Sequence, residues 1–205
     1  MLRFVRKAAL VAFALALFTP GEAQAITHNQ VTIADFSFTP ATVTPKLHSD
    51  VTWTNNGPSV HTATSDSTNP DGSVGIALWD SGDISVGSQY SFLVIAAGKF
   101  PYYCTIHTSM TGTVSVGVQI QPPTGPLGTT FTIRVGTGMA PHGFVYDIQM
   151  AQPGGSFQDW MTGITQNSET WTPTESGTYK FRSRYRRLSD DGASLYSAAK
   201  SVAVT

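Results

Sequence analysis

The chain has 205 residues, with 12 Lys and Arg against 13 Asp and Glu, 12% charged residues and a single cysteine. This is the composition of a globular protein, and the near-neutral charge excludes a strongly basic nucleic-acid-binding protein. One cysteine cannot form an internal disulfide, so a disulfide-stapled scaffold is excluded as well.

Residues 1–25 have the pattern of a secretory signal peptide. Basic residues near the N-terminus precede an apolar run from Ala8 to Phe18, and the small-residue sequence Ala23-Gln24-Ala25 follows. The apolar run is shorter than the roughly 20 residues that span a bilayer, so we expect no membrane insertion. The pattern predicts cleavage after Ala25 and export of a soluble chain to a periplasm, a cell surface or the extracellular medium.

The rest of the chain predicts an all-β protein, because short apolar runs alternate with polar residues and helical periodicity is lacking. In the first half, the expected strands are Val31–Ile33, Val51–Trp53, Tyr90–Val94, Phe100–Cys104 and Val114–Val118. In the second half, they are Phe131–Val135, Phe144–Ile148, Tyr179–Phe181 and Val202–Val204. Such spacing, with frequent turns, is typical of sandwiches and barrels.

Proline and glycine cluster between the two halves, at Pro122, Pro123, Gly125 and Pro126. We interpret residues 121–128 as a linker between a first domain, residues 26–120, and a smaller second domain, residues 129–205. The charge changes at the same place. The first domain carries two basic and six acidic residues, a net charge of −4, and residues 121–205 carry seven and six, a net charge of +1.

The lone Cys104 points to chemistry in the first domain. A free thiol in an oxidising compartment needs burial or a ligand, and a buried small hydrophobic residue is the plain alternative. Here, however, Cys104, His107 and Met110 share one short loop, and His61 on an earlier strand end offers a second imidazole. A thiolate, two imidazoles and a thioether form the donor set of a blue-copper site, whereas zinc disfavours a thioether.

The first domain resembles the cupredoxins, with the plastocyanin and amicyanin type nearest. The resemblance covers nearly all of residues 27–118, through the segments Val31–Pro40, Val51–His61, Asp80–Gly82 and Tyr102–Thr113. It implies a Greek-key β-sandwich with one type 1 copper ion per chain, and the positions that match the family's ligands are His61, Cys104, His107 and Met110. It also implies an electron carrier that is not an enzyme, with His107 as the electron exit and a redox protein, not identified by the sequence, as its partner.

Two departures from these relatives concern the surroundings of the copper. Many relatives carry Asn after the first ligand His, where its side chain ties the two ligand loops together, but this chain has Thr62, whose hydroxyl can also donate or accept. The nearest relatives have Pro where this chain has Ile106. Ile106 retains a backbone N–H, which leads to the hypothesis that this amide donates to the Cys104 sulfur.

The second domain resembles a fibronectin type III or immunoglobulin-like sandwich, and Tyr179 looks like a tyrosine-corner residue. In the same strand Lys180, Arg182, Arg184 and Arg186 occupy alternate positions, which places the four basic residues on one face and Tyr179, Phe181 and Tyr185 on the other. We call these four residues the basic stripe. It is either a solvated outer face or a surface that docks on an acidic partner or on the acidic first domain.

The sequence therefore predicts an exported one-electron carrier with a copper-binding first domain and a second domain for positioning or partner docking. Two alternatives stay open. One is a copper-binding module for delivery or storage, and the other is a metal-free structural or adhesive surface protein. The presence of all four ligand types in the expected order argues against the metal-free alternative.

Overall fold

The structure is a computed structural model that describes residues 28–205, so the predicted signal peptide lies outside the described residues. All regular secondary structure in this range is β-strand, which confirms the all-β prediction. Within residues 28–205 there is no apolar helix of membrane-spanning length.

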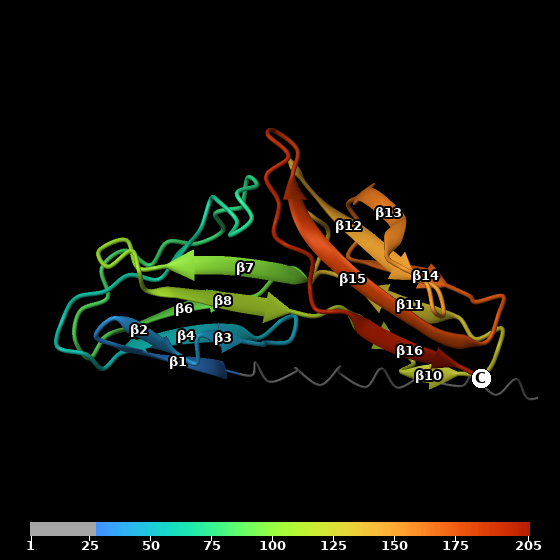
Figure 1. The fold of residues 1–205 in the computed structure, drawn as a ribbon, viewed down its shortest axis with the longest axis horizontal. Helices are drawn as coiled ribbons and strands as arrows, with labels where there is room; N and C mark the ends of the chain where they lie inside the picture. The colour runs from blue at the N-terminus through green and yellow to red at the C-terminus, as the bar shows by residue number, and fades with distance from the viewer. Residues whose placement is uncertain (1–27) are drawn as a thin grey trace, which may run out of the picture.

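The first half forms two four-stranded sheets (Figure 1). One sheet has the order β2-β1-β4-β6 and the other the order β3-β8-β7-β5. Their strands are β1 (His28–Ala34), β2 (Ser37–Thr39), β3 (Thr42–Val43), β4 (Asp50–Asn55), β5 (Thr64–Ser65), β6 (Gln89–Leu93), β7 (Gly98–Tyr103) and β8 (Thr111–Val116). The pairs β1–β4 and β3–β8 are parallel, and the remaining pairs are antiparallel.

The two sheets meet through the alternating apolar residues that the sequence predicted. From one sheet the core receives Val31, Ile33, Val51 and Trp53, and from the other it receives Phe100, Tyr102, Val114 and Val116, all of them buried. Because side chains in a strand point to alternate faces, the residues between them lie on the outer faces. Burial of these large side chains stabilises the sandwich.

The second half contains a five-stranded sheet, β10-β16-β15-β12-β13, and a three-stranded sheet, β14-β11-β9. The strands are β9 (Gln119–Gln121), β10 (Thr124–Gly125), β11 (Phe131–Arg134), β12 (Phe144–Ala151), β13 (Gln158–Ile164), β14 (Ser168–Trp171), β15 (Gly177–Arg187) and β16 (Lys200–Val204). In β15 the hydroxyl of Tyr179 donates to the carbonyl oxygen of Glu175 at 3.0 Å, a bond that closes the turn before the strand.

The segment predicted as a linker takes part in the sheets of the second half. Strand β9 pairs with β11, and β10 pairs with β16, so Gln121, Thr124 and Gly125 of this segment belong to the sheets. Proline removes only its own N–H donor, and the residues on either side of Pro122 and Pro123 keep theirs. A proline-rich composition thus marked a change of direction between short strands.

The two halves are also joined by hydrogen bonds. The Ala97 amide donates to the carbonyl oxygen of Val135 at 2.8 Å, and Lys99 and Leu195 exchange two backbone bonds of 2.9 and 3.1 Å. The buried residues of both halves form one continuous apolar cluster. Strand β7 starts at this contact and ends at Tyr103, next to Cys104, so the loop of Cys104 lies at the end of the first half that is remote from the second (Figure 1).

The alternation predicted for the basic stripe is confirmed, because Tyr179, Phe181 and Tyr185 are buried while the four basic side chains lie on the opposite face. The stripe is not free positive charge. Arg184 and Arg186 donate to the buried carboxylate of Asp147 at 2.9 and 2.8 Å.

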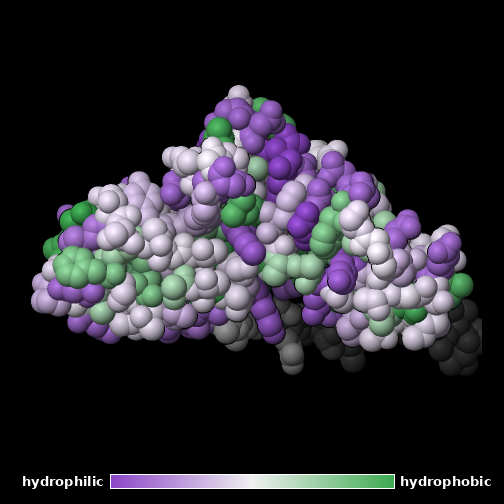
Figure 2. Space-filling model, viewed as in Figure 1, coloured by the Kyte–Doolittle hydropathy of each residue, from purple (hydrophilic) through white to green (hydrophobic). Residues whose placement is uncertain are grey.

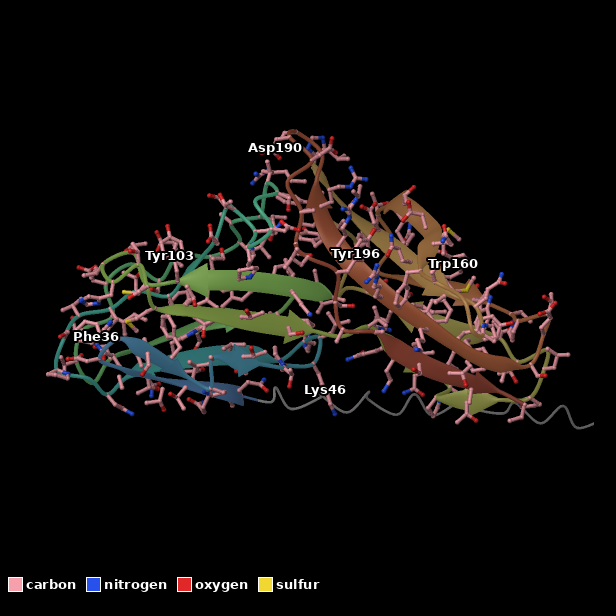
Figure 3. The ribbon with its side chains drawn as sticks, viewed as in Figure 1. Phe36, Lys46, Tyr103, Trp160, Asp190 and Tyr196 are labelled. Atoms are coloured by element: carbon pink, nitrogen blue, oxygen red, sulfur yellow. The ribbon has the colours of Figure 1, made fainter. Side chains whose placement is uncertain are left out.

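Aromatic rings hold the middle of the stripe. The Arg182 guanidinium lies 4.1 Å from the ring centre of Phe157 and 4.7 Å from that of Tyr196, which Figure 3 labels. Cation–π contacts of this kind fix a guanidinium against the sheet. The stripe is therefore largely an internal network of the second half.

Candidate metal centre

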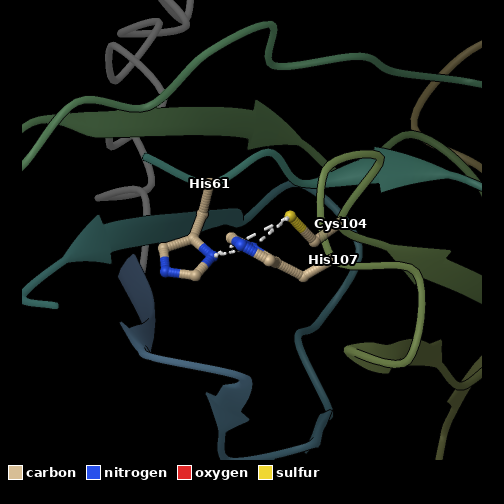
Figure 4. Close-up of side chains that lie close together, drawn as sticks. All are labelled: His61, Cys104 and His107. Atoms are coloured by element: carbon tan, nitrogen blue, oxygen red, sulfur yellow. Dashed lines mark hydrogen bonds between the residues drawn. The ribbon is translucent and has the colours of Figure 1, made fainter. Parts of the chain in front are cut away.

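Three of the four predicted ligands meet in the structure. The Nδ1 atoms of His61 and His107 lie 3.8 and 3.7 Å from the Cys104 sulfur and 3.1 Å from each other (Figure 4). They are the only group of three or more His, Cys, Asp or Glu side chains in residues 28–205 whose ligand atoms approach closely enough to hold a metal ion.

The triangle of donor atoms fits a metal ion. A point at its centre lies about 2.1 Å from all three atoms, close to the roughly 2.0–2.3 Å of typical metal bonds to imidazole nitrogen and thiolate sulfur. Two imidazoles and one thiolate in a trigonal arrangement are typical of blue-copper sites. The donor set therefore fits copper.

Backbone and amide hydrogen bonds position His61. His61 and Ile84 exchange two backbone bonds, 3.3 Å from the His61 amide and 2.7 Å from the Ile84 amide. The buried side chain of Asn55 donates to the carbonyl oxygens of Ser59 and Ile84, which fastens the loop before His61 to the same segment. The imidazole of His61 is fully buried as a result.

The second ligand loop is closed on itself between β7 and β8. The Cys104 amide donates to the carbonyl oxygen of Met110 at 3.1 Å, and the Met110 amide donates to that of His107 at 2.8 Å. Met110 is 1% exposed, so its side chain is buried in the same loop as the other two ligands. Its role as the fourth ligand stays a prediction.

Thr62 connects the two ligand loops in two ways. Its amide donates to the Cys104 sulfur at 3.3 Å, and its hydroxyl oxygen accepts the Thr105 amide at 2.8 Å and contacts the Thr105 hydroxyl at 3.1 Å. The hydroxyl thus takes the tying role that the resemblance gives to Asn. In the described chain the sulfur accepts no bond from the Ile106 amide, so that hypothesis is wrong.

We expect Thr62→Val to loosen the ligand loops without removing a ligand. Valine preserves the shape and the backbone N–H but cannot accept the Thr105 amide, which is left without its partner at a cost of about 1–3 kcal/mol. Urea unfolding of the metal-free protein measures this loss. Thr64→Val is the control, since the Thr64 hydroxyl donates to Asp80 at 2.9 Å, lies 3.3 Å from the Thr62 hydroxyl and accepts no backbone amide. Equal unfolding midpoints for the two variants would contradict the tie.

Two residues that the sequence reasoning missed contact the imidazoles from outside the ligand loops. Both belong to the turn between β1 and β2. Asp35 Oδ1 lies 3.3 Å from His61 Nε2, and the ring of Phe36 stands perpendicular to that of His107 with centroids 5.1 Å apart. Asp35 is 26 residues from His61 in the chain, and no local pattern links residues so far apart.

The two histidines differ in their access to solvent. His61 is buried, whereas His107 is partly exposed. Around them Phe36, Val60 and Ile106 are exposed large apolar residues. The edge of the metal centre at His107 therefore reaches a locally apolar surface.

Comparisons with known proteins show the family of the chain. A family model described as a cupredoxin-like domain matches residues 7–116, more than half of the chain, so the chain belongs to the cupredoxin-like family. Among curated proteins there is no match.

Several solved structures are similar to the first half. A purple cupredoxin from Nitrosopumilus maritimus has 25% sequence identity over 43% of this chain and 98% of its own, with a TM-score of 0.39. A reduced amicyanin variant has 27% identity over 43% of this chain and 80% of its own, with a TM-score of 0.37. The Cu(I) form of another amicyanin variant has 27% identity over 45% and 84%, with a TM-score of 0.38.

Proposed function

We propose that this chain is an exported type 1 copper protein that carries single electrons and has no substrate of its own. His61, Cys104, His107 and Met110 hold one copper ion, which when bound supplies the Cu(II)/Cu(I) couple. The observation that carries the proposal is the convergence of two imidazole nitrogens and one thiolate around a point at metal-bond distance. Membership of the cupredoxin-like family supports it.

Hydrogen bonds of the protein hold the proposed ligands in position. Thr62 holds the sulfur and the second loop, Asn55 holds the segment before His61, and the Cys104–Met110 backbone bond closes the ligand loop. Ligands fixed by packing and hydrogen bonds change little when the charge at the centre changes. Small rearrangement between two charge states is what a one-electron carrier requires.

The surface at His107 suits a transient redox partner. Phe36, Val60 and Ile106 are exposed there, and Figure 3 places Phe36 at the outer end of the first half, where Figure 2 shows apolar surface. We propose that an unidentified redox protein docks on this surface and exchanges electrons through His107. An exposed apolar patch marks an interaction site, and weak redox encounters use small interfaces.

We propose that the second half is a fibronectin type III or immunoglobulin-like sandwich that positions the copper domain. The bond from the Tyr179 hydroxyl to the Glu175 carbonyl supports this, because a tyrosine of such sandwiches bonds to the backbone a few residues upstream. Its contact with the opposite end of β7 leaves the surface at His107 free. The second half then acts as a spacer or partner adaptor.

Copper loading of the full chain tests the function. We expect one copper per chain, an intense thiolate-to-copper band in the visible spectrum, and a reversible one-electron wave in voltammetry that persists over many cycles. Copper delivery or storage predicts instead ready release of Cu(I) to a chelator. A colourless protein at full copper occupancy would contradict a type 1 site, and a protein that binds no copper would support the metal-free alternative.

A further inference from the structure

The turn between β1 and β2 brings a carboxylate to the side of His61 that faces away from the metal centre. His61 Nδ1 points toward Cys104 and His107, and the opposite nitrogen, Nε2, lies 3.3 Å from Asp35 Oδ1 (Figure 4 shows the ring with Nδ1 toward the other ligands). The imidazole is fully buried, while the Asp35 side chain is 31% exposed. The carboxylate thus lies at the boundary between the buried ring and solvent.

Other contacts hold this carboxylate in place. Asp35 Oδ1 accepts the Ser59 amide at 3.3 Å, and Oδ2 accepts the Ser59 hydroxyl at 3.3 Å, so Asp35 grips the loop that carries His61. A Cβ on Gly57 would lie 2.8 Å from Asp35 Oδ1, which makes Gly57 the residue that lets the carboxylate approach. Four residues from two separate segments therefore build the contact.

A neutral imidazole carries one proton, and its position decides which nitrogen can bind a metal. A carboxylate oxygen can only accept, so the neighbouring Nε2 must carry the proton and donate it to Asp35. Nδ1 is then left with a free lone pair that faces the sulfur. A negative charge at the outer nitrogen also raises the basicity of the inner nitrogen as a ligand.

We propose that Asp35 is a positioning residue of the copper centre that holds His61 in its Nε2–H form and lowers the reduction potential. The potential falls because a more basic nitrogen donor stabilises Cu(II) more than Cu(I). The part that concerns the potential rests on the proposed function. The part that concerns the proton on His61 does not need copper.

The first measurement uses the metal-free full chain. Nitrogen-15 NMR of the neutral His61 imidazole reports which ring nitrogen carries the proton. We expect Nε2–H in the wild type and in Asp35→Asn, whose amide oxygen can still accept. We expect a mixture of the two forms in Asp35→Leu, which cannot accept. An Nδ1–H form in the wild type would overturn the proposal, whatever the protein does with copper.

The second measurement is voltammetry of the copper-loaded protein. Asp35→Asn keeps the size of the side chain and removes the charge, so we expect a higher potential than in the wild type. Asp83→Asn is the control, because it removes the same charge from an exposed residue that does not contact His61. Asp83 lies next to Ile84, whose backbone pairs with that of His61. Equal shifts in the two variants, or a lower potential in Asp35→Asn, would overturn the role of Asp35. A wild type that binds no copper would instead refute the proposed function and leave the NMR result standing.

Discussion

Copper-loaded Cys104→Ser protein is expected to show no thiolate-to-copper band in its visible spectrum, while its β-structure remains. The band needs a sulfur ligand, and in residues 28–205 Cys104 supplies the only thiol. Serine is nearly the same size and leaves the backbone bond between Cys104 and Met110 in place. Visible and far-UV circular dichroism spectra of the same sample measure both properties.

His107→Gln serves as a second variant for the same site. It removes an imidazole but leaves the thiolate, so we expect a band of altered energy or intensity with copper still bound. Retention of an unchanged band in Cys104→Ser would show that the band does not come from a thiolate ligand and would contradict the proposed site. If Cys104→Ser is unfolded, Cys104 is needed for packing of the core, a role that its complete burial allows. The spectrum of His107→Gln then decides whether Cys104 also binds copper.

Asp147→Asn is expected to lower the free energy of unfolding by about 2–3 kcal/mol. Asp147 is 1% exposed and accepts bonds from Arg184, Arg186 and the Gly163 amide. The variant leaves two arginines facing a neutral amide. The loss is smaller than for a fully buried pair, because both guanidinium groups are partly exposed and water solvates them. Urea unfolding measures it.

The bonds to the Asp147 carboxylate also make the free energy of unfolding depend on pH. Burial raises the pKa of Asp147, but the bonds from Arg186, Gly163 and Arg184 outweigh it and hold the pKa below its ordinary value. Because the pKa of Asp147 is lower in the folded than in the unfolded state, its charge stabilises the fold at pH values above the unfolded-state pKa of about 3.9. This stabilisation is lost as the pH falls through the folded-state pKa. We therefore expect the difference between wild type and Asp147→Asn to shrink below about pH 4.

Asp159→Asn is the control for charge on the same sheet. Asp159 is exposed and accepts a bond from the Gln149 side chain, so its replacement should change stability by less than about 0.5 kcal/mol. An equal loss in both variants, or a difference that persists at low pH, would contradict a special role for Asp147.

The hydrogen-bond and ring partners of the arginines in the basic stripe decide between the two interpretations of that stripe. Alternation in β15 placed the basic stripe on one face, which the structure confirms, and docking on an acidic surface was one of two interpretations. Two of the four cations are bonded to Asp147, and Arg182 lies between two aromatic rings. The stripe thus contributes to the second half itself, and the apolar surface at His107 is the better docking candidate.

Much of the fold was predictable because it depends on local patterns. Alternation located β1, β4, β6, β7, β8, β11, β12, β15 and β16, since side chains in a strand point to alternate faces. Strands β13 and β14 escaped because their sequences, QDWMTGI and SETW, contain no run of alternating apolar residues. The linker interpretation of the proline-rich segment stays a prediction, and composition did not reveal that Gln121, Thr124 and Gly125 pair with strands of the second half.

The sequence by itself singled out the candidate donors, because Cys104, His107 and Met110 share one short loop whose spacing and chemistry are local. Only the tertiary structure decided what surrounds them. Thr62, not Ile106, donates to the sulfur, and Asp35 reaches His61 from another strand. Which amide or carboxylate faces a ligand depends on how strands distant in the chain pair and turn, and residue types along the chain carry no record of that approach.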